Sequence, residues 1–447
     1  MTMDNSHSEP GRLQLVLRAL RARNYRLFFF GQTVSLIGTW MQTIAMSWLV
    51  YRLSNSAFLL GLVGFAGDLP SFILMPIAGV WADRLDRRKV VIATQTLAMV
   101  QALILAGLVL SHTVQIWHII SLAIFLGFIN AFDMPTRQAF VIEMVERKDD
   151  LQNAIALNSS IFNAARLLGP SIAGILIAAV GEGYCFLING LSFLAVIAAL
   201  LAMRIKTHPH RANIRDTFAE LKEGFLYVYR FIPIRSILIL VALVSLMGMN
   251  YAVLMPIMAK DILKGGPHTL GFLMGATGLG ALVAAVFLAS RRTVLGLGRI
   301  IPMACALFSV CIIALSFSRS FTLSLFIMLL AGFGVMTQIA SSNTLIQTMV
   351  EDDKRGRVMG MYAMSVRGIS PFGALLAGSL AAKIGAPYTL AIGGACCLLG
   401  AAWFSRKLPA IRKLTRPIYV RAGIIPEVAA GLGSATQAVI TPEDAQK

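Results

Sequence analysis

Twelve apolar runs alternate with short polar segments along the chain, and this alternation is its dominant pattern. A membrane-spanning helix needs about 20 consecutive, mostly apolar residues. Each run has about that length or more, so the pattern predicts an all-α membrane protein with twelve transmembrane helices. The runs cover residues 27–53, 57–81, 89–111, 115–137, 153–180, 184–203, 234–258, 268–290, 299–318, 321–346, 357–382 and 386–405.

One polar interruption, residues 204–233, is longer than the others and lies near the middle of the chain. Its second part, Asp216 to Arg230, has apolar residues at helical spacing and predicts an amphipathic helix on the membrane surface. The segment therefore predicts a linker between two bundles of six helices. The expected units are a cytoplasmic segment 1–26, a first bundle 27–203, the linker 204–233, a second bundle 234–405, and a tail 406–447 that starts basic and becomes disordered.

The two expected bundles show weak internal similarity. A stretch that starts at Gly127 ends in Met-Val-Glu at residues 144–146, and a stretch of equal length from Gly332 ends in Met-Val-Glu at residues 349–351. Repeats of this kind are typical of transporters that arose by duplication. The sequence therefore predicts two pseudo-symmetric bundles packed face to face.

Composition and charge agree with a membrane protein. The chain is 57% hydrophobic and 13% charged, with a net charge of +18. In a soluble protein this basicity would suggest nucleic acid, but about 32 Lys and Arg residues fall in one set of alternate loops and about five in the other, which follows the positive-inside rule. The pattern predicts a bacterial inner-membrane protein in contact with the lipid bilayer, with both termini cytoplasmic and no nucleic-acid partner.

Signals of enzymes and metal proteins are missing from the sequence. The five cysteines lie in apolar runs and the six histidines are scattered, without metal-ligand or disulfide spacing. No phosphate-binding loop follows a strand, which argues against an ATP-driven pump. We expect a monomer that is not an enzyme and has no cofactor and no metal.

The loop between the second and third runs carries the most specific motif. Residues 79–88 read GVWADRLDRR, with five charges between two apolar runs. This spacing resembles the signature loop of the major facilitator superfamily. Three further segments, SLIGTWMQTIAMSWLVYRL, FDMPTRQAFVIEMV and NAIALNSSIFNAARLLGPSIAG, resemble the branch that contains enterobactin exporters and macrolide-efflux proteins. The resemblance covers most of the chain and implies the fold of that superfamily.

The resemblance implies a conformational gate at this loop. In the family, the loop aspartate caps the helix that matches run 357–382, and a later arginine pairs with an acid at the end of run 115–137. Charged loop residues that only set topology are the alternative, and the second half lacks an acid in its matching loop, LASRRTVLGLGR. The gate residues implied are Gly79, Asp83, Arg84, Arg87, Arg88, Asp133 and Arg137, with Asp83 as the cap and Arg87–Asp133 as the pair.

Asp68 is the candidate for proton coupling. It lies about 11 residues into its run, or roughly 16 Å along a helix, near the middle of the bilayer. A carboxylate at that depth marks a functional site by default, because it is costly unless it is paired or faces water. Three readings remain open: a proton carrier, a structural ion pair with Arg367, or a cavity-lining residue with neither role.

Two intramembrane arginines each precede a proline by four residues. The first resembles the antiporter motif of the family, of which the Gly-Pro core and one later glycine are present, and that motif is associated with export. A proline kink that serves only packing is the alternative. Ala123 stands where proton-coupled drug exporters of the family have an arginine. The residues of this predicted pair or kink are Arg166, Gly169, Pro170, Gly174, Arg367 and Pro371.

A substrate cavity needs polar groups among apolar walls. The resemblance implies that the runs 27–53, 115–137, 234–258 and 321–346 line such a cavity. Hydrogen bonds between helices are the alternative role of the polar residues in these runs. The candidates are Gln32, Trp40, Gln42, Asn130, Asn250, Tyr251 and Gln338.

Together these features predict a secondary active transporter, a proton-coupled exporter of amphipathic small molecules such as a siderophore, a macrolide or another drug. It would work by alternating access between the two bundles. An importer or facilitator of a metabolite is one alternative. A protein that uses the transport fold for membrane assembly or regulation, through its basic tail, is another.

Overall fold

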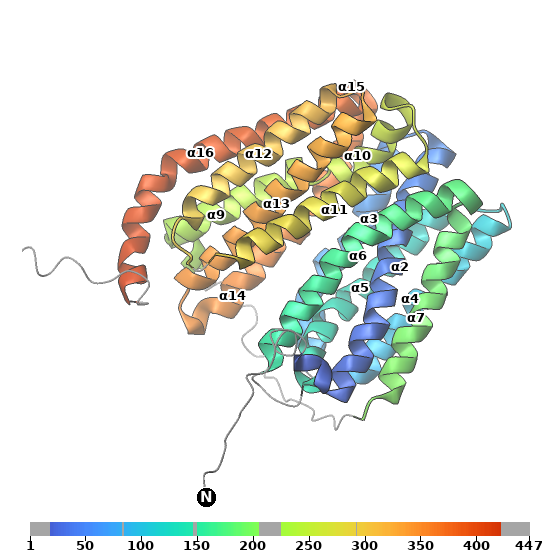
Figure 1. Cartoon of the computed structure of the whole chain (residues 1–447), viewed down its shortest axis with the longest axis horizontal. Helices are drawn as coiled ribbons and strands as arrows, with labels where there is room; N and C mark the ends of the chain where they lie inside the picture. Colours follow the sequence, from blue (N-terminus) through green and yellow to red (C-terminus); the bar gives the residue numbers. More distant parts are fainter. Residues whose placement is uncertain (1–17, 83–84, 146–149, 205–224, 292, 422–447) are drawn as a thin grey trace, which may run out of the picture.

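The computed structural model describes residues 18–82, 85–145, 150–204, 225–291 and 293–421, and for residues 75–82, 352–353 and 421 it describes the backbone only. These residues form helices joined by short loops, and Figure 1 shows them as two bundles side by side. The first half contains η1 (Arg18–Arg21), α2 (Arg23–Ser54), α3 (Ala57–Ala82), α4 (Arg87–Leu110), α5 (Ile116–Met144), α6 (Leu151–Val180) and α7 (Glu182–Ala202).

The second half starts with a helix that is interrupted twice. Its elements are α9 (Ile232–Leu243), η3 (Val244–Gly248), α10 (Tyr251–Ile257), η4 (Met258–Ile262), α11 (Pro267–Ala289), α12 (Leu297–Phe317), α13 (Phe321–Met349), α14 (Asp352–Ala363), η5 (Met364–Gly368), α15 (Ser370–Ile384) and α16 (Ala386–Arg421). We call the end of the bundles at residues 55–56, 181, 263–266 and 385 the far end, and the opposite end, near residues 85, 150, 204, 290 and 351, the terminal end.

Within the described ranges, ten helical segments are long and apolar enough to cross a membrane. The other two predicted spans correspond to α2 and to the segment 352–384, formed by α14, η5 and α15. In α2, glutamine, threonine and serine side chains lower the hydropathy, and in α14 charged residues do so. The all-α membrane fold is therefore confirmed, whereas the count of twelve spans stays a prediction.

Three π-helical turns, η3, η4 and η5, interrupt the second half. A π-helical turn leaves backbone carbonyls without their usual helical donors. At η3 the side chain of Asn250 supplies donors, since its Nδ2 lies 2.8 Å from the carbonyl oxygen of Ser245 and 3.0 Å from that of Leu246. The continuous helices expected at 234–258 and 357–382 are thus segmented, which apolar periodicity alone does not reveal.

Two seams join the halves, α3 against α15 and α6 against α11. Each contains a pair of glycines in backbone contact. A Cβ atom added at Gly378 would lie 2.8 Å from the Cα of Gly61, and one added at Gly174 would lie 3.0 Å from the Cα of Gly271. Small residues allow such close approach of membrane helices. Both glycine pairs lie toward the far end, so the halves are packed tightly there.

The seams also show that Pro170 and Pro371, each four residues after an arginine, are not equivalent in the two halves. A Cβ at Gly61 would lie 2.5 Å from the carbonyl oxygen of Ala374, and one at Gly271 would lie 2.5 Å from that of Pro170. The pseudo-symmetry therefore relates Pro170 to Ala374, nearly one helical turn beyond Pro371. The equal Arg-to-Pro spacing in the two halves does not mark equivalent positions.

The linker and the tail lie only partly within the described residues. Of the predicted amphipathic helix Asp216 to Arg230, residues 225–230 are helical, and the rest lies outside the described part of the chain. Phe225 and Tyr229 are exposed there. The basic stretch that we expected to begin a tail at residue 406 instead continues α16 as far as Arg421, and residues 422–447 lie outside the described part.

The seam between α3 and α15 gives a stability prediction. Gly61→Ala is expected to lower the melting temperature, because its Cβ would lie 2.5 Å from a backbone oxygen and the helices must move apart. Overpacking of this kind costs about 1–3 kcal/mol. Gly107→Ala is the matched control, because no heavy atom lies within 4 Å of a Cβ there. Thermal unfolding in detergent measures both, and equal melting temperatures would contradict the tight seam.

Candidate functional site

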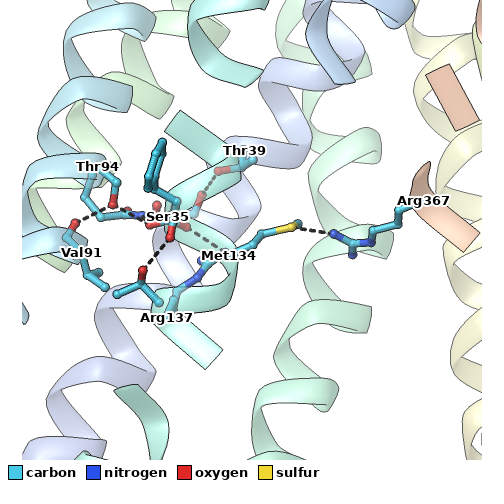
Figure 2. A network of polar contacts seen from close by, with 11 residues as sticks. Ser35, Thr39, Val91, Thr94, Met134, Arg137 and Arg367 are labelled. Atoms are coloured by element: carbon cyan, nitrogen blue, oxygen red, sulfur yellow. Dashed lines mark hydrogen bonds and ion pairs between the residues drawn. The ribbon is translucent and has the colours of Figure 1, made fainter. Parts of the chain in front are cut away.

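A polar network that includes Thr94 and Arg137 lies in the first half (Figure 2), and the Asp133 carboxylate contacts both of them. Its Oδ1 accepts hydrogen bonds from Thr94 Oγ1 at 2.9 Å and from Gln95 Nε2 at 2.8 Å, and its Oδ2 lies 3.2 Å from Arg137 Nη2. The residue is only 4% exposed. A buried carboxylate is tolerated when it is paired and hydrogen-bonded. The network thus ties α4 to α5 and neutralises one mid-membrane charge.

Arg87 has a different partner from the one predicted. Its Nη1 lies 2.8 Å from Glu143 Oε1, at the terminal end of α5. Asp133 is ten residues before Glu143, which is about 15 Å along the helix and level with Thr94 rather than with Arg87. The expected Arg87–Asp133 ion pair is therefore absent from the described contacts, because Asp133 lies too deep in the bundle. The depth at which residues of two packed helices meet cannot be read from the sequence.

The other predicted gate residues lie mostly outside the described contacts. Asp83 and Arg84 are outside the described residues, and the surroundings of Gly79 are not described, so the cap on the helix near residue 357 stays a prediction. Arg88 donates to the carbonyl oxygens of Leu200 and Leu201, both at 2.9 Å. An arginine at the C-terminal carbonyls of α7 satisfies groups that the helix leaves unpaired.

Asp68 and Arg367 face each other across the seam between the halves. The Asp68 side chain is exposed, and it makes no hydrogen bond or ion pair with the described residues. Arg367, from η5, interacts electrostatically with Asp68 and with Arg137. Its Nη1 donates to Met134 Sδ at 2.7 Å, and Figure 2 shows it reaching across to α5. The expected Asp68–Arg367 ion pair is not among the described contacts, although the two charges are near enough to attract each other.

Arg166 lies on the other seam, beside aromatic side chains of the first half. Its Cζ lies 6.0 Å from the centroid of the Trp40 ring, which packs edge to face with Phe162 at 5.7 Å. A Cβ added at Gly169 would lie 2.5 Å from the Cβ of Trp40, so this glycine lets α6 approach α2 closely. Pro170 lies inside α6, which continues as one helix to Val180.

Of the seven cavity candidates, several have structural roles. Gln42 accepts from Asn189 at 2.7 Å and donates to Gln101 at 3.0 Å, which holds α2, α7 and α4 together. Asn250 satisfies the carbonyls at η3. Tyr251 is buried against Phe308.

The remaining four candidates either have polar atoms without a hydrogen-bond partner among the described residues or are partly exposed. Gln32 and Gln338 are buried, and Gln32 Oε1 and both side-chain polar atoms of Gln338 have no hydrogen-bond partner among the described residues. Trp40 and Asn130 stay partly exposed. The seven residues therefore do not converge on one described site.

A contact between the halves at the far end was missed by the sequence analysis. The Tyr51 hydroxyl, on α2, donates to Asp261 Oδ2 in η4. Lys260 Nζ donates to Asn55 Oδ1 at 2.8 Å and lies 5.2 Å from the centroid of the Tyr51 ring. We call these four residues, Tyr51, Asn55, Lys260 and Asp261, the far-end latch. The adjacent base and acid just past run 234–258 were the only signal in the sequence.

Comparison with known proteins places the chain in a family. The family model described as "Transmembrane secretion effector" matches residues 16–418. The chain is 26% identical over 372 residues to a staphyloferrin A transporter of Staphylococcus aureus, covering 83% of this chain and 92% of the relative. It is 27% identical over 399 residues to the multidrug efflux pump Tap of Mycolicibacterium fortuitum, covering 87% and 96%.

Solved structures show the same architecture. A crystal structure of a mutant of the nucleoside transporter NupG matches with a TM-score of 0.67 at 14% identity, over 87% of this chain and 99% of that one. The match at this identity concerns the fold alone. With the family model spanning nearly the whole helical region, the chain belongs to the transmembrane secretion effector family of the major facilitator superfamily, and it is a multi-pass membrane transporter rather than a member of an enzyme class.

Proposed function

We propose that the protein is a proton-coupled exporter of amphipathic small molecules in a bacterial inner membrane, with its terminal end in the cytoplasm. The observation that carries this proposal is the Asp68 carboxylate, which is exposed and unbonded at mid-depth beside a seam between the halves. A carboxylate there can take up and release a proton only if water reaches it, and its exposure supports such access. Arg367, from the opposite half, interacts with it electrostatically, so a change in its charge is felt by both halves.

Export is supported by the relatives. One is named a multidrug efflux pump, and the matched family model is described as a secretion effector. An importer or facilitator would use the same fold, and transport in the opposite direction is the observation that would favour it. A role as an assembly protein would depend on the tail beyond Arg421, so deletion of residues 422–447 separates that alternative from a transporter, which keeps its activity without them.

Alternating access is supported by the distribution of contacts between the halves. The glycine pairs of both seams and the far-end latch lie at or toward the far end. Toward the terminal end, polar side chains are exposed on both halves, namely Gln138 on α5 and Thr344 and Gln347 on α13. A protein closed at the far end and polar toward the cytoplasm is in the state that would receive substrate from inside. Opening outward then requires the latch to break.

The first prediction concerns proton coupling. Asp68→Asn is expected to abolish substrate uptake driven by a pH gradient in everted membrane vesicles, because the amide cannot carry a proton, while downhill substrate exchange continues. Asp86→Asn is the control, since Asp86 only caps the start of α4 by accepting from the Lys89 amide. Undiminished gradient-driven transport by Asp68→Asn would rule out this residue as the proton carrier.

The second prediction concerns the far-end latch. Tyr51→Phe removes the hydroxyl that donates to Asp261 and little else, so the outward-open state should gain population. A hydrogen bond to a charged group contributes about 1.5–3 kcal/mol, which is more than a tenfold change in the equilibrium constant. The measurement is labelling of an Ala57→Cys reporter by a membrane-impermeant thiol reagent, in a chain without its five native cysteines.

Arg52→Gln is the matched control for this latch. Arg52 forms an ion pair at the same end with Glu182 at 2.7 Å, but both residues belong to the first half. Its loss should therefore leave labelling of the reporter unchanged. If Tyr51→Phe and Arg52→Gln affect the labelling equally, the latch does not control opening.

A further inference from the structure

Arg166 differs from Arg137 and Arg367, the two other arginines at mid-depth, because it has no acidic partner among the described residues. Arg137 pairs with Asp133, and Arg367 interacts with Asp68. In the described part of the chain, the Arg166 side chain makes no ion pair and no hydrogen bond. Its guanidinium group makes a cation–π contact with the Trp40 ring. An unpaired arginine in a membrane span is costly and marks a functional site.

We propose that Arg166 binds an anionic group of the transported molecule, so that the substrates are amphiphiles carrying a carboxylate or a similar anion. This inference rests on the proposed transport function and narrows it to a substrate class. Neutral and cationic amphiphiles would gain nothing from an uncompensated guanidinium. The charge thus separates anionic compounds from the other amphiphilic molecules that an apolar cavity could hold.

The pseudo-symmetry explains why Arg166 lacks an acid. Gly61 and Gly271 occupy equivalent places in the two seams, and seven residues later the first half has Asp68 whereas the second has Gly278. A Cβ added at Gly278 would lie 2.7 Å from the carbonyl oxygen of Arg166. The backbone of α6 therefore occupies the space that a carboxylate at this position would need.

The guanidinium is positioned to accept a ligand. It lies over the Trp40 ring, which Phe162 supports from the side, and a stacked arginine keeps its N–H edge available. That edge binds a carboxylate through two parallel hydrogen bonds. Arg166 remains partly exposed, so the edge is not covered by protein. The aromatic pair also offers apolar surface for the non-polar part of an amphiphile.

A polar exposed surface leads from the terminal end toward Arg166. Ser159 and Ser160 on α6 are exposed, and they lie about 10 Å nearer the terminal end along the same helix. On α2, Thr39 and Thr43 flank Trp40 and are also exposed. Each of these hydroxyl groups donates to the carbonyl oxygen one helical turn earlier and keeps its oxygen available to accept a hydrogen bond from water. An anion could therefore reach Arg166 from the terminal side.

The test is a binding measurement with paired probes on the purified full-length protein in detergent. The probes are pyrenebutyrate, naphthaleneacetate and decanoate, each compared with its neutral primary amide. The wild-type protein should bind at least one carboxylate more than tenfold more tightly than its amide. Arg166→Gln should remove this preference while amide binding remains, and Arg166→Lys should keep part of it, because a point charge replaces the two-pronged contact.

Several outcomes would overturn the proposal. It fails if the wild type shows no preference for any of the three carboxylates, or if the preference survives in Arg166→Gln. Arg52→Gln, which removes a far-end arginine, should keep the preference and controls for the loss of positive charge in general. Since binding is measured without a gradient, failure of proton coupling or of export would leave these results unchanged. If Arg166→Gln does not fold, the wild-type preference and Arg166→Lys still decide the question.

Discussion

The cost of an unpaired charge in a membrane span governs the arrangement of this protein. Within the hydrocarbon, a charged side chain must find a partner or face water. Asp133 meets this demand inside the first half, through Thr94, Gln95 and Arg137. Asp68 and Arg367 meet it only jointly and across a seam, so their balance depends on how the halves are packed. The network of Asp133 stabilises one bundle. The attraction between Asp68 and Arg367 changes whenever the two halves move relative to each other.

Close packing and helix irregularity act together at the seams. Glycine pairs bring α3 to α15 and α6 to α11, which closes the far end. The π-helical turns η4 and η5 carry residues of the second half that contact the first half, Lys260 and Asp261 in one and Arg367 in the other. A π-helical turn shifts the face that a side chain occupies and is frequent at functional sites. The irregular turns of the second half thus supply the described polar contacts with the first half, whereas regular helices form the close-packed seams.

The sequence was sufficient for the architecture and insufficient for the pairing of charges. Apolar length and the loop at residues 79–88 predicted an all-α transporter, because both depend on local composition. Arg87 was paired with Asp133 instead of Glu143, because the depth at which two helices meet is set by tertiary packing. The latch residues are separated by about two hundred positions, and η4 and η5 leave no mark on hydropathy. Gln42 was a candidate for a cavity or for hydrogen bonds between helices, and it makes such bonds to two helices, a choice that the sequence alone left open.

The asymmetry between the halves extends this reasoning. Gly127 packs on the carbonyl oxygen of Gly67, and Gly332 packs on that of Thr277, so α5 and α13 are equivalent with a constant offset. That offset places Gln338 at the position of Asp133, and Gln338 is 1% exposed with both polar atoms unpartnered among the described residues. Both acids described at mid-depth, Asp68 and Asp133, therefore belong to the first half. The second half has Gly278 and Gln338 at the equivalent positions. Among the described residues, the acids at mid-depth thus lie in one half of a duplicated fold, and no carboxylate pairs with Arg166 at its seam.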